Sequence, residues 1–113
     1  MSDIKPLTTD AASIEDEFHS NTSVVTSVAS TMTSTTLLSA NPDRKGFVLV
    51  NDSEQDCFVK FGTTASTASY TIKMAGFTTG TPATYENLSP TYRGRIDAIW
   101  SSINGSMKIT EHT

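Results

Sequence analysis

Residues 90–111 read PTYRGRIDAIWSSINGSMKITE and contain the clearest strand pattern in this 113-residue chain. Apolar side chains occupy every second position of residues 96–100, and this period of two predicts a strand with one strongly apolar face. The Asn104-Gly105 pair is a strong turn signal, and the alternation resumes over residues 107–111. We therefore predict a closing hairpin, which contributes much of the core because it holds the only Trp.

The composition favours an all-β domain. Ser and Thr together make up nearly a third of the residues, and strong helix formers are few. Thr suits pleated, half-exposed surfaces, whereas Ser suits turns and caps. A chain of this length fits one domain with a small core.

The charge of the chain argues against two classes of partner. A net charge of -4 and a pI near 4.9 disfavour a nucleic-acid binder, which usually carries a basic face, and also disfavour an anionic membrane surface. A single cysteine excludes an intrachain disulfide, and no apolar run is long enough to span a membrane. The N-terminus lacks a signal-peptide pattern, so we expect synthesis in a cytoplasm.

Residues 1–22 differ from the rest because they are acidic and contain few β-branched residues. Asp10 is placed to cap a short helix that carries Ile14 and Phe18 on one face. A helix this short is marginal alone, so we predict an extended arm that orders when it docks on a neighbour; a frayed tail is the alternative. The arm residues expected at an interface are Asp10, Ile14, Glu15, Asp16 and Phe18.

Residues 23–113 are predicted to form the folded domain. Two strands are expected within residues 23–40, separated by a polar stretch at 30–34 that reads as a loop or an edge strand. The apolar run 47–50 predicts a strand buried on both faces, and a polar loop then leads to a strand at 57–61, giving a second hairpin. Further strands are expected around 70–74 and 85–88. About eight short strands indicate a β-sandwich or small barrel, and we favour a single antiparallel, jelly-roll-like sandwich.

Four cations stand beside glycines and form a candidate interface: Arg44, Lys45, Arg93 and Arg95. We expect such a cluster to dock an acidic patch, for example the acidic arm of a neighbouring copy. The alternative is that these charges lie at strand ends and stay hydrated, where exposed pairs contribute only about 0–1 kcal/mol.

Other chemistry-bearing residues favour structural roles. Asp52, Glu54 and Asp56 alternate in one loop, but they lack the Gly and the distal Glu of an EF-hand, so a solvated acidic loop is favoured over a calcium site. His19 and His112 have no partner at zinc-ligand spacing, and Cys57 has no adjacent base. We therefore expect no enzyme, no cofactor and no metal, with Cys57 as a small core or edge residue.

The aromatic residues Tyr70, Tyr85, Tyr92 and Trp100 offer a possible sugar-stacking face. Their period-two placement favours core or interface positions for most of them.

The complete pattern of turns and strand ends resembles a recurrent small structural protein of tailed bacteriophages and prophages. The resemblance covers residues 35–111, and it is carried by Leu37-Leu38, Ala40 to Gly46, Asn51-Asp52-Ser53, Val59 to Gly62, Ala65-Ser66, Ser69 to Lys73, Tyr85-Glu86, Tyr92 to Trp100, Gly105-Ser106 and Thr110-Glu111.

The resemblance implies a virion protein that decorates or cements the outside of the capsid by binding the major capsid protein or other virion proteins. Because capsid lattices offer three-fold positions, a homotrimer is the expected oligomer. The alternative is a tail, neck or fibre component that binds a receptor or carbohydrate.

Overall fold

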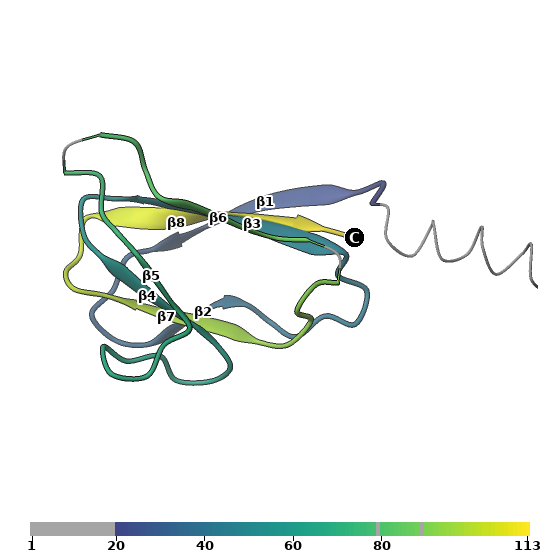
Figure 1. The fold of residues 1–113 in the computed structure, drawn as a ribbon, viewed down its shortest axis with the longest axis horizontal. Coiled ribbons are helices and arrows are strands. Elements are labelled where there is room, and N and C mark those ends of the chain that lie inside the picture. The colour runs from purple at the N-terminus through teal and green to yellow at the C-terminus, as the bar shows by residue number, and fades with distance from the viewer. Residues whose placement is uncertain (1–19, 79, 89) are drawn as a thin grey trace, which may run out of the picture.

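The computed structural model describes residues 20–78, 80–88 and 90–113, which form a sandwich of two four-stranded antiparallel sheets (Figure 1). The described residues contain no helix, and the prediction of an all-β sandwich is confirmed. The strands are β1 (Ser23–Ala29), β2 (Thr35–Leu38), β3 (Gly46–Ser53), β4 (Cys57–Phe61), β5 (Ile72–Met74), β6 (Thr84–Asn87), β7 (Ile96–Trp100) and β8 (Gly105–His112).

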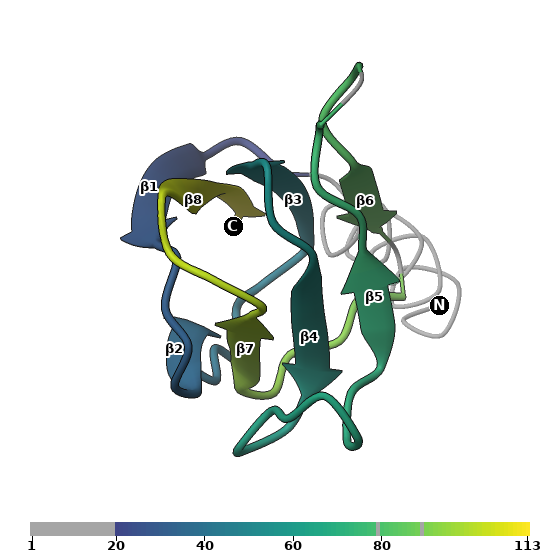
Figure 2. The same cartoon turned by 90° about the vertical axis from the view of Figure 1, so that its left-hand side faces the viewer.

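The strand order is that of a jelly roll. One sheet runs β1-β8-β3-β6 and the other β2-β7-β4-β5, as the end-on view in Figure 2 shows. Strand 1 pairs with 8, 2 with 7, 3 with 6 and 4 with 5, as in one long hairpin. That hairpin is folded over on itself, so that β3 meets β8 and β4 meets β7 and two sheets result.

Both predicted hairpins are wrong. β7 and β8 lie in different sheets, and so do β3 and β4. The turn signal at Asn104-Gly105 is real, but the chain there crosses from one sheet to the other. Asn104 and Gly105 both have positive φ, and a Cβ at Gly105 would lie 2.5 Å from Ser53 Cβ. Glycine is required where the backbone passes so close to the end of β3.

The core lies between the sheets. The first sheet contributes Phe47, Leu49, Met107 and Ile109, and the second contributes Cys57, Val59, Ile96, Ala98 and Trp100; all are buried. The prediction that residues 47–50 are buried on both faces is wrong, because Val48 and Val50 are only partly buried on the outer face. β3 therefore alternates like an antiparallel strand with one covered face.

Candidate functional site

The four edges of the two sheets are not equivalent. Three edge strands are short, and each carries a feature that discourages pairing with another chain. β6 has four residues and includes Glu86; β5 has three and includes Lys73. β2 has four residues, and its register shifts between Thr36 and Leu38. Short length, charge and irregular register are common protections of a sheet edge.

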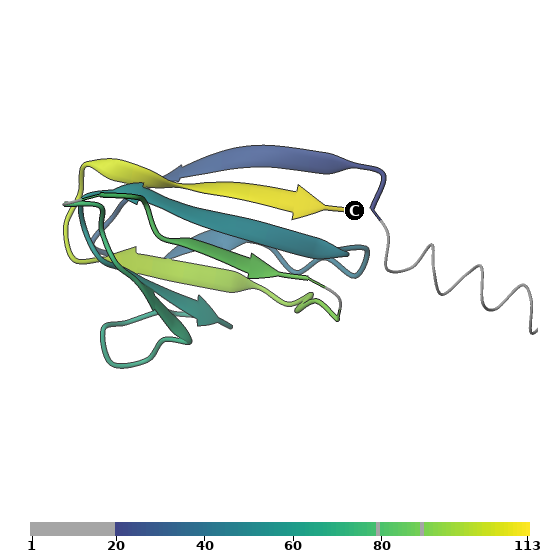
Figure 3. The ribbon, with the colours of Figure 1, turned by 45° about the horizontal axis from the view of Figure 1, so that its top comes forward.

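β1 has none of these protections. Its seven residues, SVVTSVA, contain no charge and no proline. Its register with β8 is unbroken from Ser23↔His112 to Ala29↔Ser106. Figure 3 shows β1 as the outermost strand of its sheet, and no strand of the described chain pairs with its outer edge. A long, regular, uncharged edge of this kind is a template for another strand.

Hydrogen bonds at both ends of β1 show which backbone groups face outward. Thr113 N donates to Thr22 O at 2.8 Å, and Ser30 N donates to Gly105 O at 2.9 Å. Hydrogen-bonded residues alternate in an antiparallel ladder, so the even-numbered residues of β1 face β8. The N–H and C=O groups of the odd-numbered residues therefore point away from the sheet: Ser23, Val25, Ser27 and Ala29.

The side chains of β1 are exposed on both faces. Val25 lies on the outer face and is 69% exposed. Val24 and Thr26 share the inward face with buried Ile109 of the neighbouring strand, yet Val24 is 53% exposed and Thr26 is also exposed. The opposite sheet does not cover this part of β1, so apolar surface adjoins the free edge on both sides.

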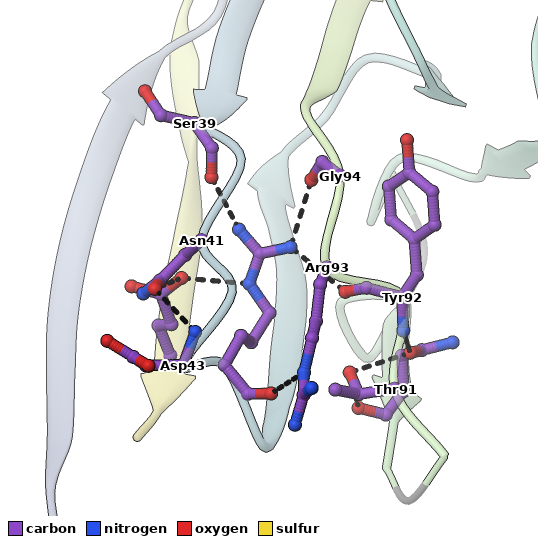
Figure 4. A network of polar contacts seen from close by, with 10 residues as sticks. Ser39, Asn41, Asp43, Thr91, Tyr92, Arg93 and Gly94 are labelled. Atoms are coloured by element: carbon purple, nitrogen blue, oxygen red, sulfur yellow. Dashed lines mark hydrogen bonds and ion pairs between the residues drawn. The ribbon is translucent and has the colours of Figure 1, made fainter.

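The expectation that Arg44 belongs to an exposed cation cluster is wrong. Its side chain is fully buried. Figure 4 labels Ser39, Tyr92 and Gly94, whose backbone oxygens accept hydrogen bonds from its guanidinium. Nε donates to Glu111 Oε2 at 2.8 Å. The remaining donors reach backbone carbonyls: Nη1 contacts Tyr92 O at 2.9 Å and Gly94 O at 3.0 Å, and Nη2 contacts Ser39 O at 2.6 Å. Arg44 thus ties the loop before β3 to the segment before β7 and to β8.

The other predicted cations are divided between two places. Lys45 and Arg93 line one shallow hollow together with Pro42, Asp43 and Thr113. Arg93 is exposed, and its Nε donates to the backbone oxygen of Arg44 at 2.7 Å. Arg95 lies apart from them and pairs with Asp97, with Nε 2.8 Å from Oδ1. The structure therefore places Lys45 and Arg93 together at the surface beside the buried Arg44, and Arg95 elsewhere.

Asp97 is buried on the outer side of β7, opposite the apolar face that the sequence predicted. Its Oδ2 accepts the Thr64 backbone N–H at 2.7 Å. Burial alone would raise the pKa of this carboxyl. The hydrogen bonds from Arg95, Thr64 and Thr36, with the Arg95 charge, outweigh burial and lower the pKa below its ordinary value. Asp97 therefore anchors the loop after β4 as a carboxylate.

Cys57, expected to be a small core or edge residue, lies in the core. The thiol is buried, and burial raises its pKa to about 12. A thiol in this state is a poor nucleophile. Among the described residues, no group of three or more His, Cys, Asp or Glu is placed to hold a metal ion, and this holds for Asp52, Glu54 and Asp56.

Most of the aromatic residues belong to the core, as predicted. Trp100 is buried, and Tyr85 and Tyr92 pack against the core cluster. Tyr92 stacks on Phe61 at 4.8 Å between ring centroids. Tyr70 differs because it is exposed. The sequence predicted a strand from residue 70, but the observed strand β5 begins at Ile72, so Tyr70 lies in the loop before it.

The predicted arm residues Asp10, Ile14, Glu15, Asp16 and Phe18 lie outside the described residues, and so does His19. Within the described part of the chain, no helix has the length and apolarity needed to cross a membrane. No protein-family model, curated protein or solved structure matches this chain.

Sequence reasoning missed the open edge of β1. The strand itself was expected, but its edge position depends on the order of strands in the sheet. One signal was available: residues 23–29 form a β-rich stretch with neither charge nor proline. A strand of that composition is prone to pair with other chains unless another strand pairs with it or another element covers its edge.

Proposed function

We propose that this chain is a non-enzymatic structural protein of a bacteriophage virion, which decorates or cements the capsid by binding the major capsid protein. The observation that carries the proposal is the unprotected edge of β1. A jelly roll that leaves one regular, uncharged edge open is suited to joining a neighbour by strand addition. Jelly-roll domains are a common building unit of viral capsids.

The use of polar residues supports a structural role. The polar side-chain atoms of buried Arg44, Asn51 and Asp97 form hydrogen bonds within the chain. Cys57 is buried and protonated at neutral pH. An active site would need such groups to converge on a space for substrate. Within the described residues they stabilise loops and strand ends instead.

Binding in many copies would allow stable attachment to the capsid even if each contact is weak. A decorating protein binds a lattice in many copies, and several weak contacts per copy multiply into stable attachment. The hollow lined by Lys45 and Arg93, together with Asp43, supplies a second, polar contact in which the two cations outnumber the one acidic side chain. Residues 1–22 would supply a third, by docking on an adjacent subunit or on the shell.

Co-sedimentation tests this proposal. Purified protein is mixed with particles assembled without it, and the bound fraction is measured after centrifugation. We expect saturable binding by the full-length protein. Deletion of residues 1–20 should leave the domain folded, because β1 begins only at Ser23, but should weaken binding, because the arm is removed. Failure of the full-length protein to bind any such particle would contradict the proposal.

The second candidate is a tail, neck or fibre protein that binds carbohydrate, and the exposed Tyr70 favours it. Tyr70 packs edge-on against Phe58, with ring centroids 5.1 Å apart, and Lys73 Nζ lies 5.6 Å from the centroid of the Phe58 ring. Exposed aromatic rings are common sugar-stacking platforms. Glycan binding that Tyr70→Ala abolishes would favour this candidate over capsid decoration.

A further inference from the structure

We propose that the partner for the open edge of β1 is β1 of a second copy of this chain, in antiparallel pairing about a two-fold axis at Thr26. The dimer itself does not depend on the proposed function; only its role, joining copies within a virion, rests on that proposal. Its physical basis is the self-complementarity of residues 23–29.

The two-fold pairing places compatible side chains opposite one another. Thr26 faces Thr26 of the other copy, and Val24 faces Val28 on the inward side. On the outer side Val25 faces Ser27, and Ser23 faces Ala29. The strand itself carries no charge, so no like charges of the two β1 strands oppose each other. The charge that contacts it is Lys108 of β8, whose Nζ donates to Ser27 Oγ at 3.0 Å. Pairs of β-branched residues and Thr–Thr pairs are among the stabilising cross-strand pairs.

The backbone fits the same register. The odd-numbered residues of β1 point their N–H and C=O groups outward, and with the axis at Thr26 every odd residue meets another odd residue. Val25 with Ser27, and Ser23 with Ala29, therefore form hydrogen-bonded pairs on both sides of the axis. The two sheets would join into one eight-stranded sheet, with β1 paired on both sides.

Two-fold pairing gives a closed dimer and not an open-ended filament of copies. An isologous contact uses the same strand from both molecules and leaves no β1 edge open. The outer edge of the joined sheet is then β6 at both ends, which is short and carries Glu86. A two-fold contact does not build a trimer and fills the β1 edge, so any three-fold contact and the contact with the capsid shell would use other surfaces of the dimer.

Disulfide trapping tests the register. In this pairing the two Thr26 residues form a non-hydrogen-bonded pair with Cα atoms about 4.5 Å apart, within the range of a disulfide. We expect Thr26→Cys to give a covalent dimer on mild oxidation. Val24→Cys is the matched control, because the two copies of residue 24 would lie more than about 13 Å apart. The buried Cys57 thiol should contribute little background.

Sedimentation equilibrium of untagged protein tests the edge itself. Ser27→Pro removes an outward N–H that β8 does not use, and Val25→Lys adds a charge at an exposed site; we expect each to weaken dimerisation by at least about tenfold. Thr84→Lys, an exposed change on the opposite edge of the sheet, should leave dimerisation unchanged. Circular dichroism checks that each variant is folded.

The outcomes separate this inference from the proposed function. A wild-type protein that stays monomeric at millimolar concentration, equal trapping of Thr26→Cys and Val24→Cys, or equal weakening by Thr84→Lys and Val25→Lys would overturn the β1 dimer. Each of these results leaves co-sedimentation with particles unaffected. A protein that dimerises through β1 but binds no particle contradicts the proposed function alone.

Discussion

Trp100 Nε1 donates a hydrogen bond to Asn51 Oδ1 at 3.1 Å, which joins β7 in one sheet to β3 in the other. Both side chains are buried. Asn51 Nδ2 in turn donates to three backbone oxygens, those of Gln55, Met74 and Ala75, at 2.9 to 3.1 Å. One amide thus fixes the distance between the sheets and anchors the loop after β3 and the end of β5.

Substitution of Trp100 separates packing from hydrogen bonding. Trp100→Ala should destabilise the fold by about 3–5 kcal/mol because it leaves a cavity in the core. Trp100→Phe keeps most of the volume but removes the donor to Asn51, so we expect a loss of about 1–3 kcal/mol. Urea unfolding gives both values. A Phe variant as stable as the wild type would show that the hydrogen bond contributes nothing.

Arg44 should be intolerant of replacement. Arg44→Met leaves three carbonyl oxygens without this donor and leaves Glu111 Oε2 with only Asn41 Nδ2, at 3.4 Å. Breaking a buried pair in this way costs about 3–5 kcal/mol. Arg93→Met is the matched control; this side chain is exposed and makes one hydrogen bond to a backbone oxygen, so the loss should not exceed about 1 kcal/mol. Equal losses from the two variants would mean that burial of Arg44 is unimportant.

Asp97 should make stability depend on pH in the acid range. Its pKa is lower in the folded protein than its ordinary value, so the folded state binds this proton less readily than the unfolded state. The stabilisation is therefore fully present above the unfolded pKa of about 3.9 and is lost as pH falls through the folded pKa. The difference in unfolding free energy between wild type and Asp97→Asn should be largest above about pH 5 and should shrink in more acidic solution. A difference that is constant with pH would contradict the assigned contacts.

Cys57 should be inert in the folded protein. Its thiol is buried and its pKa is raised to about 12, so little thiolate exists at pH 8. We expect slow labelling by a thiol reagent under native conditions and complete, rapid labelling in denaturant. Rapid native labelling would show that β4 opens easily, and the trapping experiment would then need Cys57→Ser.

Much of the fold could be predicted from the sequence because alternation reports which face of a strand is covered. Residues 96, 98 and 100 face the core as expected, and each predicted strand is present. Alternation carries no information on which strand lies alongside. From the sequence, strands that follow each other with a short polar loop therefore read as hairpins, although β3 to β4 and β7 to β8 cross between sheets.

The candidate site was harder to predict because it depends on partners that are distant in the chain. Arg44 is charged and follows a turn, which is typical of a hydrated surface residue. Its acceptors are Glu111, 67 residues away, and backbone oxygens that no side-chain pattern reveals. The open edge of β1 likewise follows only from the strand order.

The number of copies in a particle tests the central claim, that this chain is a capsid-decorating component, most directly. Virions are purified from cells that carry the gene, and the chain is quantified by mass spectrometry against the major capsid protein in the same sample. We predict a ratio that corresponds to hundreds of copies per particle. A dozen copies or fewer would contradict capsid decoration, and absence from the particle would contradict any structural role in the virion.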